Sequence, residues 1–178
     1  MRVIGGKYKN RKLFHLKDPR CRPTQDRVRE AIFNVLQQYS SPDRVLDLFS
    51  GTGSLGIEAL SRGASEVAFV DTHTQIIERN LKTLDMTDQD VHQMIHKMPA
   101  KRFIQLTKIN YDLIFIDPPW TKLSHYESTL KAISEFGILS NQGLVVCEHP
   151  HDFELRSMMF TMLDTRKYGT MRITLLKQ

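Results

Sequence analysis

The hydrophobic positions of this chain alternate between a strand pattern and a helix pattern from Arg44 onward. Short apolar runs predict five strands, at 44–49, 66–71, 91–95, 111–117 and 143–148. Segments with helical spacing lie between them: 54–62, a stretch with Ile76, Ile77, Leu81 and Leu84 on one face, 99–106, and a stretch with Tyr126, Leu130 and Ile133 that stops near Gly137. Strands separated by single helices pair in parallel through crossover connections. The pattern therefore predicts an α/β fold, a doubly wound, Rossmann-like sheet with both faces covered.

An amphipathic helix is expected ahead of this alternation. It begins after Pro23-Thr24 and is stopped by Pro42. Its apolar face consists of positions with helical spacing: Val28, Ala31, Ile32, Val35, Leu36 and Tyr39.

Antiparallel pairs are expected at both ends of the chain. Residues 1–17 contain Gly5-Gly6 between short alternating runs, which is typical of a small basic hairpin. Near the other end, 162–168 and 170–177 flank Gly169 and predict two antiparallel strands.

Length and composition narrow the class of protein. A chain of 178 residues suits one compact domain, and its apolar runs fall short of the roughly 20 residues of a membrane span. Cys21 and Cys147 are too few for a disulfide framework or a cysteine-rich zinc site, so we expect a reducing cytoplasm and no metal. We divide the unit into a basic hairpin extension over 1–20 and a main domain over 21–178.

Positive charge is concentrated at the N-terminal end. Residues 1–44 contain 11 Lys and Arg against four Asp and Glu, a net charge of +7 in a chain whose total is +5. This excess has two alternative interpretations, a solvated basic face or, as we favour, a surface that attracts a polyanion. The candidate contacts to nucleic acid are basic residues of this segment: Lys7, Lys9, Arg11, Lys12, Arg22 and Arg27.

The first motif with chemical meaning runs from strand to helix as Asp47-Leu48-Phe49-Ser50-Gly51-Thr52-Gly53-Ser54-Leu55-Gly56. Its glycines allow a tight turn and a close approach to a ligand, and the following helix start offers amide donors. Asp71, 20 residues after Gly51, is placed to accept hydrogen bonds from a ribose diol. Asp47, an acid before the glycines, suits a cationic group such as an amine or a sulfonium better than a pyrophosphate.

The second motif, Asp117-Pro118-Pro119-Trp120, follows the most apolar strand. In a doubly wound sheet this end lines the ligand crevice. Asp117 and a proline carbonyl can accept both hydrogens of an exocyclic NH2 group, while Trp120 stacks on a flat base. Accepting those hydrogens favours a pyramidal nitrogen whose lone pair points at an electrophilic methyl group. These are the candidate catalytic residues.

These motifs resemble those of amino methyltransferases, and most closely those of the RsmD family, bacterial enzymes that methylate a guanine N2 in 16S ribosomal RNA. The resemblance covers nearly the whole chain, through Arg2-Val3-Ile4-Gly5-Gly6, Arg22-Pro23-Thr24, the glycine loop, Asp117-Pro118-Pro119 and Tyr168-Gly169. Arg22-Pro23-Thr24 with its following helix is the most diagnostic segment.

The resemblance implies a seven-stranded methyltransferase sheet with a small N-terminal hairpin, and S-adenosylmethionine as cofactor with S-adenosylhomocysteine as product. It implies that the cofactor-binding residues are those of the glycine loop and the next strand end: Asp47, Phe49, Ser50, Gly51, Gly53 and Asp71. Asp117 to Trp120 would receive a flipped guanine. Two departures from the family are Trp120, where Tyr or Phe is commoner, and His96-Lys97-Met98, where an acid usually contacts the adenine.

The expected function is methyl transfer to a guanine N2 in the small ribosomal subunit, by a monomer that binds 16S rRNA and no membrane. Three alternatives stay open: an adenine-N6 or DNA methyltransferase, a nicotinamide-dependent oxidoreductase with the same glycine loop, and a non-catalytic RNA-binding protein.

Overall fold

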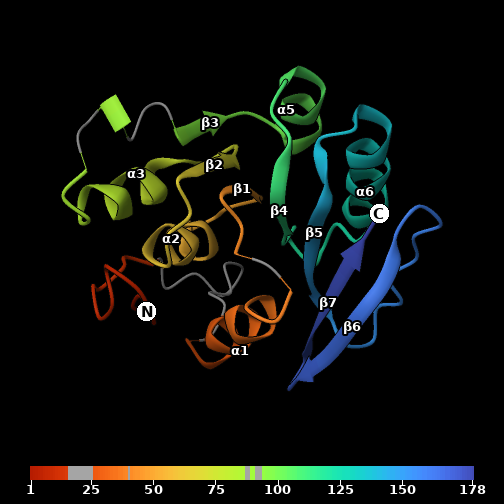
Figure 1. Ribbon diagram of the computed structural model, residues 1–178, viewed down its shortest axis with the longest axis horizontal. Helices are drawn as coiled ribbons and strands as arrows, with labels where there is room; N and C mark the ends of the chain where they lie inside the picture. The colour runs from red at the N-terminus through yellow and green to blue at the C-terminus, as the bar shows by residue number, and fades with distance from the viewer. Residues whose placement is uncertain (16–25, 40, 87–88, 91–93) are drawn as a thin grey trace.

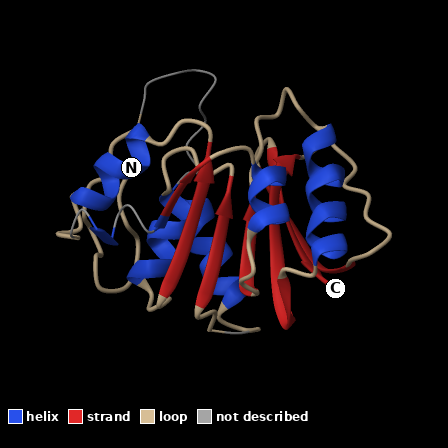
Figure 2. Ribbon diagram, turned by 90° about the horizontal axis from the view of Figure 1, so that it is seen from above, coloured by secondary structure: helices blue, strands red, loops and turns tan. Residues whose placement is uncertain are grey.

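The alternating segments form a seven-stranded sheet with helices on both faces (Figure 1, Figure 2). The structure is a computed structural model, and it describes residues 1–15, 26–39, 41–86, 89–90 and 94–178. The strands are β1 (Arg44–Leu48), β2 (Glu66–Asp71), β3 (Ile95–Lys97), β4 (Tyr111–Ile116), β5 (Leu139–Pro150), β6 (Thr161–Tyr168) and β7 (Met171–Lys177). The helices are α1 (Asp26–Leu36), α2 (Ser54–Ser61), α3 (Gln75–Lys82), α5 (Ala100–Leu106) and α6 (Ser124–Phe136).

The strand order is β3-β2-β1-β4-β5-β7-β6. β1 to β5 are parallel to one another, whereas β7 is antiparallel to both β5 and β6. The chain proceeds from β1 outward through β2 and β3, then returns to β4 on the other side of β1. In doubly wound sheets, ligands bind at such a reversal, which here lies at the carboxyl ends of β1 and β4.

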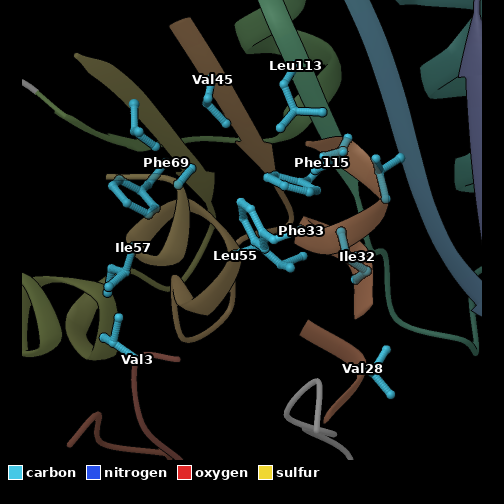
Figure 3. Close-up of a cluster of buried hydrophobic side chains, with 14 of the residues drawn as sticks. Val3, Val28, Ile32, Phe33, Val45, Leu55, Ile57, Phe69, Leu113 and Phe115 are labelled. Atoms are coloured by element: carbon cyan, nitrogen blue, oxygen red, sulfur yellow. The ribbon is translucent and has the colours of Figure 1, made fainter. Parts of the chain in front are cut away.

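Two apolar clusters cover the two faces of the sheet. Side chains alternate along each strand, so Phe115 faces α1 and α2 while Ile116 faces α5 and α6. In the first cluster, shown in Figure 3, Phe33 of α1 packs on Phe115 with ring centroids 5.9 Å apart. The predicted α/β class, the doubly wound sheet and the terminal antiparallel pair are confirmed.

Three predicted boundaries were wrong. The fifth strand, predicted at 143–148, is β5 at Leu139–Pro150, and its first residue Leu139 already pairs with Tyr111 ahead of an irregularity in the register. The third strand is β3 at 95–97 rather than 91–95, of which 91–93 lie outside the described residues. β3 is an edge strand whose place is fixed by pairing of Ile95 with Phe69 and of Lys97 with Asp71, not by its own apolar pattern. Tyr39 does not belong to the helical face, because α1 ends at Leu36 and leaves Tyr39 46% exposed.

The predicted N-terminal hairpin is present in a reduced form. Its arms run antiparallel with Arg2 opposite Lys12, and the N–H groups of Val3 and Leu13 donate to the carbonyls of Arg11 and Met1, but the pairing is too short for a regular strand. The Glu58 carboxylate of α2 accepts hydrogen bonds from the backbone N–H groups of Ile4 and Gly5, each at 2.8 Å. Gly6 has φ +73°, and a Cβ there would lie 1.6 Å from the Ser61 carbonyl oxygen, so only glycine fits. The turn is therefore docked on α2, directly after the glycine loop.

Within the described residues, no helix is both long and apolar enough to cross a membrane.

Candidate active site

The glycine loop turns sharply at the end of β1. Phe49, Gly51 and Gly53 all have positive φ, at 60°, 54° and 75°. Ser50 fixes this turn to the neighbouring strand, because its Oγ accepts the Val70 N–H at 2.9 Å and its own N–H donates to the Val70 carbonyl at 3.2 Å. The buried Ser50 therefore stabilises the turn of the loop, whereas Gly51 is partly exposed.

Asp71, the last residue of β2, binds the glycine loop from the side of the neighbouring strand. One carboxylate oxygen accepts the Gly51 N–H at 2.9 Å and the other accepts the His73 N–H at 2.9 Å. The side chain stays partly exposed and keeps free lone pairs. Asp71 is thus oriented to accept hydrogen bonds from a diol.

Asp47 lies beneath the loop and is only 2% exposed. Its Oδ2 accepts the Gly56 N–H at 2.9 Å. Burial, with a further contribution from Asp71, raises the pKa of Asp47 to about 8. Ionising a buried carboxyl is unfavourable without a positive charge nearby, so this position fits a ligand with a cationic group.

Asp117 directly follows β4, whose last residue Ile116 pairs with Leu48 of β1. Asp117 is partly exposed. Its pKa lies well above the ordinary value of 3.8, first because of burial and then because of the charges of Glu148 and Asp47. The next residues form a turn in which the Pro119 carbonyl accepts the Lys122 N–H at 2.8 Å. A carboxyl group that readily takes up a proton therefore lies beside the glycine loop.

Trp120 is held in place by a residue that the sequence indicated only as core. The side chains of Trp120 and Tyr126 share a hydrogen bond, and the Tyr126 hydroxyl donates to the backbone carbonyl of Glu148 at 2.6 Å. Tyr126 is fully buried in α6, whereas Trp120 is partly exposed. The indole is thereby anchored at the edge of the crevice, where a flat ring can stack on it.

His125 and Glu148 also lie at this site and were missed from the sequence. The His125 ring stacks on Phe49 with centroids 5.6 Å apart, and among the described residues its Nδ1 has no hydrogen-bond partner. Glu148 lies at the carboxyl end of β5 and is only 3% exposed. Its position after an apolar strand was the one signal that pointed to the crevice.

The basic candidates divide into several groups. Lys7, Lys9 and Lys12 are exposed on the docked N-terminal turn, and Arg27 is exposed on α1. Arg11 instead forms an ion pair with Asp85 at 2.7 Å. Arg22 lies outside the described residues.

Comparison with known proteins identifies the group to which this site belongs. The family model described as "Conserved hypothetical protein 95" matches residues 1–177. The "Putative rRNA methyltransferase YlbH" of Bacillus subtilis is 37% identical, over 100% of this chain and 99% of that protein. The "Ribosomal RNA small subunit methyltransferase D" of Escherichia coli K12 is 31% identical, over 83% of this chain and 74% of that protein.

Solved structures agree on the fold. A putative methyltransferase from Escherichia coli, yhhF, has a TM-score of 0.84 and 27% identity, and covers 100% of this chain and 97% of its own. A Streptococcus mutans protein described as a putative SAM-dependent methyltransferase has a TM-score of 0.67 at 18% identity, over 86% of this chain and 48% of its own. SMU.776, a putative methyltransferase complexed with S-adenosylhomocysteine, has a TM-score of 0.66 at 18% identity, over 86% of this chain and 49% of its own. The expected methyltransferase fold and the expected cofactor class both occur among these neighbours. The chain therefore belongs to the Conserved hypothetical protein 95 family, the RsmD-like methyltransferases.

Proposed function

We propose that this protein transfers a methyl group from S-adenosylmethionine to the exocyclic N2 amine of a guanine in 16S rRNA. The observation that supports this most is the position of Asp117, a proton-accepting carboxyl beside a glycine loop that has a buried acid beneath it. The similarity to relatives described as rRNA methyltransferases supports the class of substrate.

The residues around the glycine loop fit this cofactor. Asp47 would offer a buried carboxylate to its cationic methionine part, and Asp71 would accept hydrogen bonds from its ribose hydroxyls. Gly51 would leave room for it, because a Cβ there would meet only the Phe49 carbonyl oxygen, at 3.9 Å, whereas Gly53 is needed for the turn and for packing against Ile77 and Phe69. When bound, the cofactor supplies an electrophilic methyl group on a sulfonium, whose sulfur keeps the bonding electron pair as the new C–N bond forms.

Asp117 and its neighbours would prepare the amine. The nitrogen lone pair is delocalised into the guanine ring, so it is a poor nucleophile. The Asp117 carboxylate and the Pro118 carbonyl accept its two hydrogens, which favours a pyramidal nitrogen, and Trp120 holds the base flat. The raised pKa of Asp117 suits it to take the proton that the methylated nitrogen releases. Catalysis here depends mainly on positioning and electrostatics.

The N-terminal turn and the sheet would have different roles. The docked turn with Lys7, Lys9 and Lys12, together with Arg27, would bind phosphates of the RNA, and the sheet would perform the transfer. We propose that a monomer acts on the assembled or assembling small subunit.

Labelled cofactor tests this function directly. The purified protein is incubated with small ribosomal subunits from cells that lack it, with DNA and with free nucleosides. We expect label only in the 16S rRNA, as N2-methylguanine. Transfer to DNA alone would contradict the proposal, and calorimetry showing that NADH binds while S-adenosylmethionine does not would contradict the methyltransferase assignment.

Asp47 makes a separate prediction about cofactor binding. A cationic ligand favours the ionised carboxylate, so binding at pH 7 should release about one proton from a group whose pKa in the free protein is about 8. Asp47→Asn should abolish this release and weaken binding at least about tenfold, roughly 1.4 kcal/mol. Calorimetry in two buffers with different ionisation enthalpies counts the protons.

Asp47→Asn should weaken cofactor binding, but it should raise the stability of the free protein. The folded chain keeps a proton on Asp47 that the unfolded chain loses above the ordinary pKa of 3.8, so this contribution to stability is lost as pH rises through about 8. Asp47→Asn, which preserves an acceptor for Gly56, should therefore unfold at a higher temperature than the wild type above pH 8. Unchanged proton release and affinity would refute the role given to Asp47.

A further inference from the structure

Asn80 of α3 joins the N-terminal segment, residues 1–15, to the glycine loop. Its side chain is fully buried and makes three hydrogen bonds to backbone groups. Oδ1 accepts the Phe14 N–H at 2.6 Å, while Nδ2 donates to the Phe14 carbonyl at 3.0 Å and to the Thr52 carbonyl at 2.8 Å. One amide group therefore holds both the basic segment and the loop.

The bond to Thr52 fixes the glycine loop at its tightest point. Thr52 lies between Gly51 and Gly53, both of which have positive φ. The amide of Asn80 is planar, so its three hydrogen bonds together allow one orientation. The backbone of Phe14 thus orients the donor that holds Thr52. If the segment leaves, Asn80 loses one acceptor bond and one donor bond, which is unfavourable for a buried amide.

The segment is docked by contacts that RNA can strengthen. The Arg79 guanidinium carbon lies 3.4 Å from the centroid of the Phe14 ring, and Arg11 pairs with Asp85 at 2.7 Å. That ion pair is exposed, and exposed pairs contribute little to stability. Residues 1–15 contain five Lys and Arg and no Asp or Glu, so their charges repel one another and that of Arg79. Phosphates bound to the lysines of the turn would offset this repulsion and favour docking.

We propose that Asn80 is a positioning residue that couples binding of RNA at the N-terminal turn to binding of the cofactor at the glycine loop. This inference rests on the proposed function and adds that each ligand raises the affinity for the other. The two states are a segment docked on Asn80 and a segment released from it. RNA favours the docked state, in which Asn80 holds Thr52 and the loop keeps the shape that binds the cofactor. Such coupling is reciprocal, so the cofactor strengthens RNA binding by the same factor.

Two dissociation constants of the wild type test this coupling. The probes are S-adenosylhomocysteine, which has no methyl group to transfer, and small ribosomal subunits from cells that lack the protein. Each constant is measured with and without a saturating amount of the other probe. We expect each probe to lower the constant of the other at least about fivefold. A factor below about two for the wild type would overturn the inference.

Phe14→Pro and Phe14→Ala form a matched pair that leaves the buried Asn80 in place. Both remove the ring from Arg79, but only proline also removes the backbone N–H that donates to Asn80. The proline variant should lower the coupling factor to below about two, and the alanine variant should keep at least about half of it. Thermal unfolding checks that both variants are folded.

Other origins of coupling give different results with this pair. Direct contact between a base and the cofactor in the crevice would leave the factor unchanged in both variants. A link through the aromatic ring would lower it equally in both. Either result would overturn the role given to Asn80, because neither depends on the backbone N–H of Phe14.

The proposed function can fail separately from this inference. Subunits that bind the wild type and receive a methyl group, but show a coupling factor near one, would contradict only the inference. Subunits that receive no methyl group from S-adenosylmethionine would contradict the proposed function, and the inference with it.

Discussion

Asp117→Ala should reduce methyl transfer by at least about 10²- to 10³-fold while the affinity for S-adenosylmethionine stays within about twofold of the wild type. The substitution removes the carboxyl that we propose accepts the hydrogens of the amine and takes its proton. Asp47 and Asp71, the proposed cofactor-binding residues, lie on other strands and keep their own backbone partners. Initial rates with labelled cofactor and calorimetry measure the two effects separately.

Asp152→Ala is the matched control, because it removes an exposed carboxyl from the loop after β5. It should leave the rate unchanged. If Asp117→Ala kept its turnover, the mechanism proposed for the amine would be wrong.

Asp117 also predicts how the rate of methyl transfer by the wild type depends on pH. Asp117 can take up the proton of the amine only in its ionised form, and its pKa lies well above 3.8 because of burial and the charges of Glu148 and Asp47. The rate should therefore fall as the pH falls through this raised value, while the protein is still folded. An acid limb near pH 4 would contradict the raised pKa of Asp117 and the role given to it.

The triple substitution of Lys7, Lys9 and Lys12 by Gln should weaken binding to small-subunit rRNA and flatten its salt dependence. Each lost phosphate contact lowers the slope of log K against log salt by about 0.7 to 0.9, so the three together should lower it by about 2 to 3. These lysines are exposed on the docked turn, while the glycine loop keeps its contacts. Binding measured between 50 and about 200 mM salt gives the slope.

Two controls separate charge from structure. Lys131→Gln removes an exposed charge on α6, at the opposite face of the sheet, and should leave the slope unchanged. Arg11→Gln breaks the ion pair with Asp85, so it tests whether the turn stays docked on the protein rather than how strongly it binds RNA. A triple variant that lost cofactor affinity with an unchanged salt slope would show that the lysines are structural.

The sequence predicted the sheet and the two ends that form the crevice, because glycines after β1 and prolines after β4 interrupt strongly apolar runs. Asp47 and Asp117 could be found this way, since Asp117 directly precedes the prolines and Asp47 lies four residues before Gly51. β3 could not be placed, because an edge strand with His96 and Lys97 takes its register from its neighbour.

Contacts between distant parts of the chain could not be predicted from the sequence either. Glu148 lies within what reads as an ordinary strand end, and its relation to Asp117 depends on the register of β4 with β5. Tyr126 was expected only as a core residue, although its hydroxyl also holds Trp120. Charge counts alone did not reveal that Arg11 pairs with Asp85, 74 residues away.

The most direct test of the proposed function is to map methylated guanines in 16S rRNA by mass spectrometry. The cells compared lack this protein, or lack it and carry either the wild type or Asp117→Ala. We expect one N2-methylguanine to be missing from cells without the protein, restored by the wild type and not restored by Asp117→Ala. An unchanged set of 16S methylations, or a missing methyl group on an adenine or on the large-subunit rRNA, would contradict the account.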